Sequence, residues 1–463
     1  DHRLETEKLD HVIAAFQPNA LAVTVTTEAQ IADAMAASET AKTLNCPVFW
    51  GGHAATVLAD LVAKLPYVDY VGISEGEYTL LELLDVISGL ENPEDCAGIV
   101  FSAKDGTVVR TQDRPFADLA DFPPLNYSLV QTKKFFQYMD FASRMFHVFT
   151  SKGCPYKCSF CFNENFHKCQ RRRYPLEVVM HQIRELVDDY GVNGVVFEDE
   201  MFGGNKEEFR TLCNALGSFE PRIYWAAQTV MGILSREELE LAYASGCRTL
   251  VFGLESGSAE MRKKVQKYYD AGKIDETFRT CRELGISTMP NFIIGFPQEI
   301  PEQVRETVHL ILRVNADVPN VSIFTPVPGS KSYADLVASG SLKPIEDIEE
   351  YARNPKNRQT VTQNFSLIPT RELRCISSFF YWVLAFGGKS GKKTRKKGMV
   401  KVAVIGLLNH IAIEGLRRGV ANLVGTAKIF LRTFWYSHAY PSILKKYDLY
   451  KKNFGRTDWD TAK

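Results

Sequence analysis

The stretch that decides the fold is Ser151-Lys152-Gly153-Cys154-Pro155-Tyr156-Lys157-Cys158-Ser159-Phe160-Cys161. Its cysteines have the spacing C-x3-C-x2-C and follow directly after residues 147–150, which we expect to form the first strand of an alternating series. Cysteine thiolate is the standard protein ligand of iron–sulfur clusters. Cys154, Cys158 and Cys161 can therefore hold three irons of a [4Fe–4S] cluster and leave the fourth iron open to a ligand that is not protein.

Two other interpretations of these cysteines stay open. A zinc site needs a fourth cysteine or histidine, and Cys169 or His167 could be offered. Alternatively, the three cysteines bind no metal and are buried free thiols that happen to lie close together in the sequence. The remaining cysteines are scattered in apolar contexts and are predicted to be small buried hydrophobes: Cys46, Cys96, Cys213, Cys247, Cys281 and Cys375.

Strands and helices alternate after the cysteine cluster begins. We expect strands at 147–150, 194–198, 222–227, 248–252, 288–294 and 320–325, with helices at about 175–190, 205–218, 235–245, 258–268, 272–284 and 301–315. Such a series predicts an α/β fold with a partial or full (β/α)6 barrel. Chemistry is then expected at the carboxyl ends of the strands.

A second alternating series lies before the cluster. Strands are expected at 19–27, 47–50 and 67–73, with helices at 28–44, 54–65 and 78–87. This pattern predicts a doubly wound parallel sheet, which binds ligands at its carboxyl edge. Gly51, Gly52 and Gly76 stand at these strand ends, where glycine lets a ligand approach the backbone closely.

The cysteine motif resembles that of the radical S-adenosylmethionine (SAM) superfamily, with Phe160 in the aromatic position before Cys161. The resemblance implies a [4Fe–4S] cluster whose open iron binds SAM, which is cleaved to a radical that removes a hydrogen atom from the substrate. Gly253-Leu254-Glu255-Ser256 resembles a SAM-binding segment of the family, in which Glu255 and Ser256 would hold the amino-acid and ribose ends. Gly295-Phe296-Pro297 and Pro326–Ser330 resemble turns of the superfamily. Gln228 departs from the arginine that relatives often carry there.

The acidic trio Glu198-Asp199-Glu200 follows the second strand of this series. It is either a helix cap or solvated loop, or a polar contact to SAM or substrate. Asp199 is the residue we expect to make such a contact.

The two glycine turns ahead of the cluster resemble those of the cobalamin-binding subgroup of radical SAM enzymes. They read Gly51-Gly52-His53 and Glu75-Gly76-Glu77. Backbone N–H groups at such turns can bind the corrin amides and the tail phosphate. The D-x-H-x-x-G motif of a lower cobalt ligand is absent from the sequence, which predicts base-off cobalamin. His53 is either a contact to the nucleotide tail, a surface residue or a cobalt ligand. The first strand of such a domain is also missing, so we expect about one βαβ unit upstream.

Composition gives the setting. The 463 residues are 45% hydrophobic, and Lys+Arg and Asp+Glu number 55 each. The net charge is therefore zero, and we do not expect an overall positive potential that would attract nucleic acid. The charges are uneven, because residues 366–463 carry 19 basic and 5 acidic residues. Few cysteines and no signal peptide predict a cytoplasmic protein. The basic, aromatic tail is either a helical cap or a peripheral contact with a membrane surface.

We therefore predict a cobalamin-binding domain at 1–95, which by resemblance is flavodoxin-like, and a connector at 96–146 with short strands at 98–102 and 107–111. A radical SAM barrel is expected at 147–335 and a mainly helical, basic region at 336–463. The expected function, by resemblance, is transfer of a methyl group from methylcobalamin to an unactivated carbon of a small molecule, and a hydrophobic substrate is one option. No catalytic side chain is assigned. An external flavodoxin- or ferredoxin-type protein would supply electrons. The alternatives are an oxidative cyclase or ring-rearranging enzyme with the same cofactors, a tRNA methylthiotransferase, and a non-enzymatic electron carrier.

Overall fold

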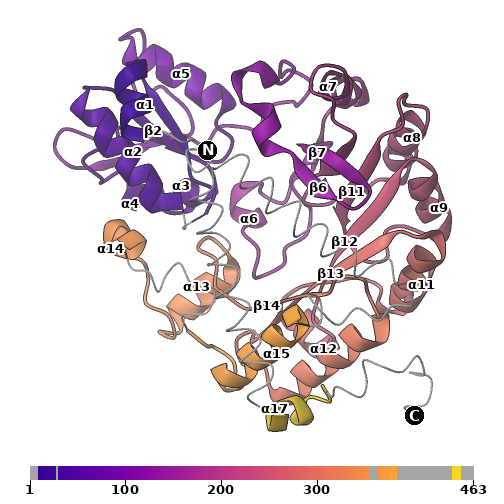
Figure 1. The fold of residues 1–463 in the computed structure, drawn as a ribbon. Helices are drawn as coiled ribbons and strands as arrows, with labels where there is room; N and C mark the ends of the chain where they lie inside the picture. The colour runs from indigo at the N-terminus through magenta and orange to yellow at the C-terminus, as the bar shows by residue number, and fades with distance from the viewer. Residues whose placement is uncertain (1–8, 28–29, 354–362, 383–440, 450–463) are drawn as a thin grey trace. The chain divides into compact units, whose positions relative to one another are not determined.

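The structure is a computed structural model that describes residues 9–27, 30–353, 363–382 and 441–449 (Figure 1). The chain divides into two compact units. The first unit holds residues 1–118, 156–170 and 325–362, and the second holds 119–155, 171–324 and 363–463. Each unit is built around its own sheet.

The first unit has a five-stranded sheet in the order β1-β2-β3-β4-β5. The strands are β1 (Leu21–Thr24), β2 (Val48–Gly51), β3 (Tyr70–Gly72), β4 (Ile99–Ser102) and β5 (Val108–Arg110). β1, β2 and β3 are parallel, whereas β4 and β5 continue the sheet in antiparallel fashion. The parallel half confirms the predicted α/β arrangement of this part of the chain.

Helices connect these strands. They are α1 (Leu9–Phe16), α2 (Ile31–Thr43), α3 (His53–Val57), α4 (Ala59–Val62) and α5 (Glu77–Ile87). The helix expected at 54–65 is two short helices, because the backbone at Leu58 leaves helical geometry. Trp50 anchors the core, where its indole nitrogen donates to Ser38 Oγ at 2.8 Å.

Three later helices also belong to the first unit: α6 (Asn163–Phe166), α13 (Lys331–Ala338) and α14 (Ile348–Arg353). Tyr67 donates to Glu349 on α14 at 2.8 Å. The amide of Ser332 on α13 donates to the Ser159 carbonyl at 2.7 Å. Residues 325–353 thus pack with the N-terminal sheet, although the sequence assigned part of them to the barrel and part to the helical region.

The second unit has a seven-stranded sheet in the order β14-β13-β12-β11-β10-β7-β6. Its strands are β6 (Gln137–Met139), β7 (Ala142–Val148), β10 (Gly194–Phe197), β11 (Tyr224–Thr229), β12 (Cys247–Glu255), β13 (Ser287–Ile294) and β14 (Asn320–Ile323). All pairs from β7 to β14 are parallel, and only β6 is antiparallel. β14 and β6 form the two edges of this open sheet, so the partial barrel is confirmed and a closed barrel is not.

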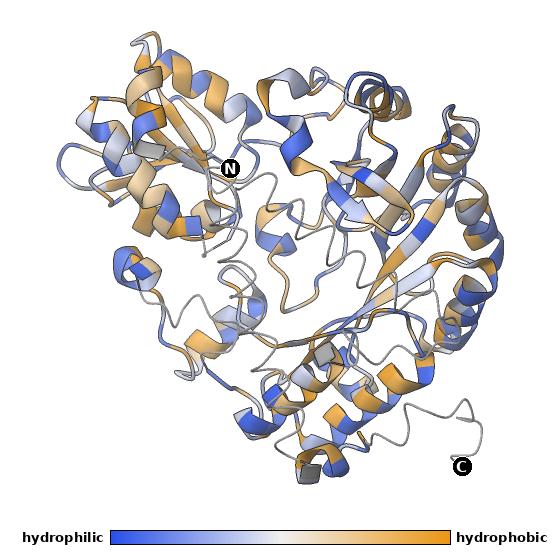
Figure 2. Ribbon diagram, in the orientation of Figure 1, coloured by the Kyte–Doolittle hydropathy of each residue, from blue (hydrophilic) through white to orange (hydrophobic). Residues whose placement is uncertain are grey.

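Helices cover the second sheet between its parallel strands. They are α7 (Leu176–Asp188), α8 (Lys206–Gly217), α9 (Arg236–Ala244), α10 (Ala259–Lys264), α11 (Ile274–Leu284) and α12 (Pro301–Val314). Figure 2 shows hydrophobic and hydrophilic residues alternating along these helices, as expected of helices with one buried face. In the core, the rings of Phe197 and Phe202 stack on each other and both contact Trp225 at an angle, and all three residues are at most 1% exposed.

Residues 96–146, predicted to be a connector, contribute strands to both sheets. β4 and β5 extend the first sheet, and β6 and β7 lie in the second. β4 and β5 match the short strands expected at 98–102 and 107–111, whereas their pairing with the first sheet depends on contacts between distant segments.

The C-terminal region is described only in part. α15 (Thr370–Trp382) and α17 (Pro441–Lys446) are helical, and Ser377 donates to the Val321 carbonyl on β14 at 2.8 Å. The apolar stretch 400–418 and the basic segment 387–398 lie outside the described residues, so the predicted membrane contact is untested. Among the residues that the structure describes, no helix is both long enough and apolar enough to cross a bilayer.

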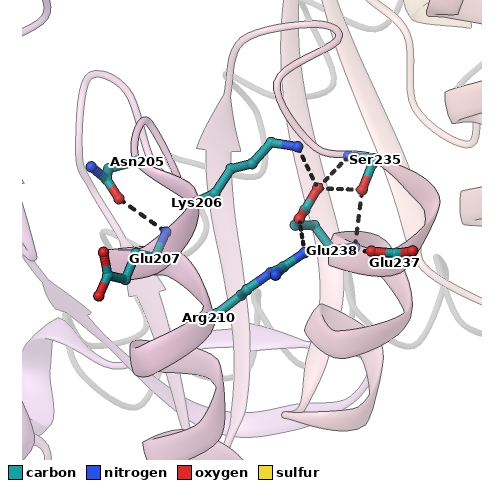
Figure 3. A network of polar contacts seen from close by, with 7 residues as sticks. All are labelled: Asn205, Lys206, Glu207, Arg210, Ser235, Glu237 and Glu238. Atoms are coloured by element: carbon teal, nitrogen blue, oxygen red, sulfur yellow. Dashed lines mark hydrogen bonds and ion pairs between the residues drawn. The ribbon is translucent and has the colours of Figure 1, made fainter.

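A buried carboxylate joins α8 and α9 on the outside of the second sheet (Figure 3). Glu238 is fully buried and closes a capping box with Ser235, whose amide donates to Glu238 Oε2 at 2.9 Å. Arg210 and Lys206 on α8 reach the same carboxylate, at 2.8 and 3.5 Å. Burial alone would raise the pKa of Glu238, but the hydrogen bonds from Ser235 and Arg210 and the charge of Lys206 outweigh it and lower the pKa to about 2.

Glu238→Gln should lower the free energy of unfolding by about 1–3 kcal/mol at neutral pH, because it removes an ionised partner of two cations. A group with a depressed pKa in the folded state stabilises above its unfolded pKa and loses this contribution as pH falls. The difference between wild type and variant should therefore be constant above about pH 5 and shrink toward pH 2. Denaturant midpoints measured from pH 7.5 downward test this. Glu237→Gln, at the 83%-exposed neighbour, is the matched control. Equal effects of the two substitutions would contradict the assignment.

Candidate functional site

The carboxyl edge of the second sheet gathers most of the residues singled out in the sequence. Parallel strands end at one common edge, so the turns after β7, β10, β12 and β13 face the same side of the sheet. The segment 149–154 follows β7, and the acidic trio follows β10. Gly253–Ser256 lies at the end of β12, and Gly295 follows β13.

Asp199 and Glu200 hold the backbone that leads into Cys154. Asp199 is 2% exposed and accepts hydrogen bonds from the Thr150 amide at 2.7 Å and from Ser151 Oγ at 2.6 Å. The Thr150 hydroxyl donates to it as well. Glu200 accepts from the Gly153 amide at 2.8 Å. The acidic trio is therefore neither a helix cap nor a solvated loop at these two positions, because it anchors the start of the cysteine loop.

The charge state of Asp199 reflects two opposed effects. Burial raises its pKa, and the hydrogen bonds from Ser151 and Thr150 oppose this rise. All three donors come from residues 150–151, so both carboxylate oxygens are occupied by this loop. A direct contact between Asp199 and SAM stays a prediction. The structure gives the residue a positioning role instead.

The three cysteines of the motif are partly exposed. Cys154 ends the anchored loop in the second unit, and Cys158 and Cys161 lie in the first unit, where the Cys161 amide donates to the Cys158 carbonyl at 2.9 Å. The described residues contain no preformed group of three side chains that could hold a single metal ion. A cubane cluster spaces its thiolates more widely than one ion does. Phe160 is partly buried beside them.

Other cysteines differ in environment. The buried thiols include Cys213, Cys247 and Cys281, and burial raises the pKa of each. Thiols with raised pKa are poor ligands and nucleophiles, which fits their prediction as small hydrophobes. Cys169 also has a raised pKa, owing to burial, and its sulfur lies 3.7 Å from the Tyr156 carbonyl.

The Gly253–Ser258 turn is distorted to direct one carboxylate. A β-bulge interrupts the pairing of β12 with β13 between Gly253 and Glu255, and Glu255 has φ of +60°. Glu255 is 7% exposed, and its Oε1 lies 3.2 Å from Lys267 Nζ. A Cβ on Gly253 would stand 2.5 Å from that carboxylate and 2.8 Å from the ammonium. A side chain at position 253 would therefore force the ends of both Glu255 and Lys267 to shift.

Ser256 stabilises the same turn through hydrogen bonds of its side chain. It is fully buried, and its Oγ lies 3.1 Å from Thr307 Oγ1 and accepts from the Ser258 amide at 3.1 Å. Thr307 donates its own proton to the Gln303 carbonyl, so Ser256 is the donor in their contact. Its single proton is thus used inside the protein. The predicted contact of Ser256 with the ribose of SAM stays a prediction, and the structure shows an anchoring role.

Three residues that the sequence did not single out fix this turn. Arg262 donates to the carbonyls of Ser256 and Gly257, at 2.9 Å each, and Tyr269 donates to the Leu254 carbonyl at 3.1 Å. The third is Lys267. All three lie shortly after the glycine-rich segment in the sequence. This position is the only signal by which the sequence could have identified them.

The turn after β13 holds another buried acid. Gly295 has φ of +83°, and its amide and that of Phe296 donate to Glu299, which is fully buried. Burial raises the pKa of Glu299 to about 7, against the effect of these hydrogen bonds. The turn at Pro326–Ser330 belongs to the first unit, where Ser330 caps α13. Gln228 on β11 is exposed, and its carbonyl accepts from the Phe202 amide at 3.0 Å.

The first unit brings its two predicted turns together. Gly52 has φ of +89°, and a Cβ there would stand 2.9 Å from the Val25 carbonyl oxygen. Ser74, just before Glu75-Gly76-Glu77, donates its amide to Thr56 on α3 at 3.0 Å. Gly76 caps α5, and Glu77 is exposed in its first turn. The side chain of Glu75 is 10% exposed and lies 3.9 Å from His167.

His53 is the most unusual residue at this edge. It is 5% exposed, and its Nδ1 lies 3.3 Å from the Thr26 carbonyl oxygen, so Nδ1 carries the proton. Its Nε2 is buried and has no hydrogen-bond partner among the residues that the structure describes. Burial lowers the pKa of His53, and nearby His167 lowers it further, against the Thr26 contact. The Phe162 ring lies 3.9 Å from the imidazole centroid. His53 is therefore a neutral imidazole with one unused acceptor, and not a surface residue.

Asp199→Asn should lower the free energy of unfolding by about 1–3 kcal/mol. The substitution replaces one accepting oxygen by an NH2 group, which cannot accept the hydrogen bonds that Thr150 and Ser151 donate. The amide of Thr150 should also exchange its hydrogen faster. Denaturant midpoints and hydrogen exchange measure the two effects. Glu198→Gln, at the partly exposed neighbour that contacts His147, is the matched control. An Asp199→Asn protein as stable as this control would contradict the anchoring role.

Comparison with known proteins supports this description. Residues 148–311 match the family model of the radical SAM superfamily. The chain is 28% identical over 335 residues to an uncharacterized methyltransferase of Pyrococcus horikoshii, covering 72% of each chain. It is 26% identical to the anaerobic magnesium-protoporphyrin IX monomethyl ester cyclase of Rubrivivax gelatinosus, covering 75% of this chain and 63% of that one.

Solved structures show the same fold. The radical SAM methyltransferase TsrM of Kitasatospora setae, with tryptophan and a SAM analogue bound, superposes with a TM-score of 0.67 at 18% identity, covering 91% of both chains. The cobalamin-dependent radical SAM enzyme OxsB superposes with a TM-score of 0.67 at 13% identity, covering 98% of this chain and 74% of that one. The chain spans 55–72% of the length of the first three curated relatives. Residues 148–311 thus form a radical SAM domain, and the chain is similar to methyltransferases and cyclases that share this fold.

Proposed function

We propose that this protein is a cobalamin-dependent radical SAM C-methyltransferase. The observation that carries the proposal is the C-x3-C-x2-C motif, whose leading segment up to Cys154 is anchored at the carboxyl edge of an open parallel sheet, the edge at which the bulged Glu255 turn also lies. The match of residues 148–311 to the radical SAM family supports it. The methyltransferase of Pyrococcus horikoshii favours methyl transfer over other radical outcomes.

The residues present fit a [4Fe–4S] cluster. Cys154, Cys158 and Cys161 supply three thiolates, and a three-thiolate set leaves one iron for SAM. A zinc site with Cys169 as fourth ligand stays the alternative; the Cys169 sulfur lies 3.7 Å from the Tyr156 carbonyl oxygen and 3.8 Å from the Asn163 amide nitrogen. A ferredoxin-like carrier is disfavoured because such clusters use four cysteines.

The first unit fits cobalamin by two observations. Gly52 has no room for a Cβ and presents bare backbone at the end of β2. His53 offers a buried acceptor, Nε2, that no residue of the described part of the chain pairs with. An N–H group of a corrin amide would satisfy it. We therefore assign Gly51, Gly52, His53 and the Glu75–Glu77 turn to cobalamin.

When bound, the cluster and SAM supply a radical that removes a hydrogen atom, and cobalamin supplies the methyl group. The chain itself binds and orients the reactants and excludes water. Asp199 and Glu200 fix the approach to Cys154. Glu255 presents a carboxylate to the amino group of SAM, and Gly253 leaves room for it. An external one-electron donor protein reduces the cluster, and the substrate is a small molecule.

Methyl transfer can be tested with SAM that carries a trideuterated methyl group. Anaerobically reconstituted protein, supplied with cobalamin, a reductant and a panel of hydrophobic candidate substrates, should yield 5′-deoxyadenosine, S-adenosylhomocysteine and a product with one CD3 in place of hydrogen. Mass spectrometry detects all three. Protein reconstituted without cobalamin is the control, and it should yield no labelled product.

The outcome also distinguishes the alternative. Three cyclase relatives, at 24–26% identity, favour a cyclase as the second candidate. A cyclase would form 5′-deoxyadenosine and an unlabelled product that has lost hydrogen. If the reconstituted protein forms neither 5′-deoxyadenosine nor S-adenosylhomocysteine from SAM, the proposed function is wrong.

A further inference from the structure

The Glu255 carboxylate is placed at a high energetic cost to the protein. Its φ of +60° lies in the left-handed region, which is unfavourable for a residue with a Cβ. A β-bulge next to a functional site typically redirects a side chain, and the one at Gly253–Glu255 does so here. The side chain is then buried at the end of β12. A distorted backbone and a buried charge together indicate that the position of this carboxylate matters.

Lys267 is the cation that faces this carboxylate. Its side chain is 12% exposed, its Nζ lies 3.2 Å from Glu255 Oε1, and it reaches there from the segment after α10. The absence of a Cβ at Gly253 accommodates both ends of the pair. A lysine at this depth is unusual unless it is paired, because an isolated buried ammonium is strongly destabilising.

The pair controls the charge of Glu255. Burial raises the pKa of Glu255, and the charge and hydrogen bond of Lys267 lower it. The other titratable groups around the turn are Tyr269, whose pKa burial raises to about 12, and Arg262, which lies over the Tyr269 ring. Tyr269 is thus neutral in the physiological range, and Arg262 bonds to backbone carbonyls. The pKa of Glu255 stays above its ordinary value, and Lys267, 3.2 Å away, is the cation that opposes the effect of burial and favours the ionised carboxylate.

We infer that Lys267 is a positioning residue of the SAM site, which holds the Glu255 carboxylate ionised and oriented toward the ammonium group of SAM. This inference rests on the proposed function. A neutral carboxyl accepts hydrogen bonds weakly and has no charge with which to attract an ammonium. Loss of Lys267 should thus weaken SAM binding through Glu255, although Lys267 itself need not touch SAM.

The test is SAM binding to the anaerobically reconstituted protein, measured by equilibrium dialysis and by the change that SAM causes in the paramagnetic spectrum of the reduced cluster. Lys267→Met, which keeps the length of the side chain and removes its charge, should weaken binding about tenfold at pH 6.5. Because its Glu255 then ionises only at higher pH, affinity should recover as pH rises to 9. Lys267→Arg should bind within about threefold of wild type. Lys263→Met, at an exposed lysine of α10, is the matched control and should not differ from wild type.

A double-mutant cycle separates this role from a structural one. In a Glu255→Gln background, Lys267→Met should have little further effect on SAM binding, because the group it acts through is gone. An equal loss in both backgrounds, or a loss that does not change with pH, would overturn the inference. If Lys267→Met binds SAM as wild type does, the inference also fails, while the proposed function stands. If wild type itself binds no SAM, the proposed function fails first.

Discussion

The parallel pairing of the strands from β7 to β14 is the constraint on which the second unit depends. Parallel strands must be joined by crossovers, so helices cover the sheet, and every strand ends at the same edge. The anchored cysteine loop, the Glu255 turn and the Glu299 turn lie at this edge for that reason alone. The sheet does not close, so β14 and β6 remain edge strands that other segments can contact. α15 packs against β14 in this way.

Buried carboxylates fix the conformation of the turns at this edge. Asp199 and Glu299 each accept backbone N–H groups of a neighbouring turn, and Glu255 pairs with Lys267. An unpaired buried charge is strongly destabilising, so each carboxylate holds its partner segment in one geometry. Far from the site, Glu238 joins α8 to α9 by the same physics. Acidic residues thus act here mainly as fixed hydrogen-bond acceptors.

The sequence predicted the α/β class, the cysteine motif and five of the parallel strands of the second sheet, because each has a strong local signal. The first strand was expected at 147–150, whereas β7 begins five residues earlier, at Ala142, and ends at Val148. The split of 54–65 into α3 and α4, the pairing of β4 and β5 with the first sheet and the place of α13 and α14 in the first unit depend on contacts between distant segments. Asp199 was recognised as distinctive, but its role depends on donors 48 and 49 residues away. Lys267 has no motif of its own, and only folding brings it onto Glu255.

The central claim is that the C-x3-C-x2-C loop holds one open [4Fe–4S] cluster, and the most direct measurement is the iron content of a variant with Cys154, Cys158 and Cys161 all changed to alanine. After anaerobic reconstitution, wild type and the Cys169→Ala control should each bind about four irons per chain and show the cluster's visible absorbance. The triple variant should lose both while it stays folded. A triple variant that still holds four irons per chain would contradict the account.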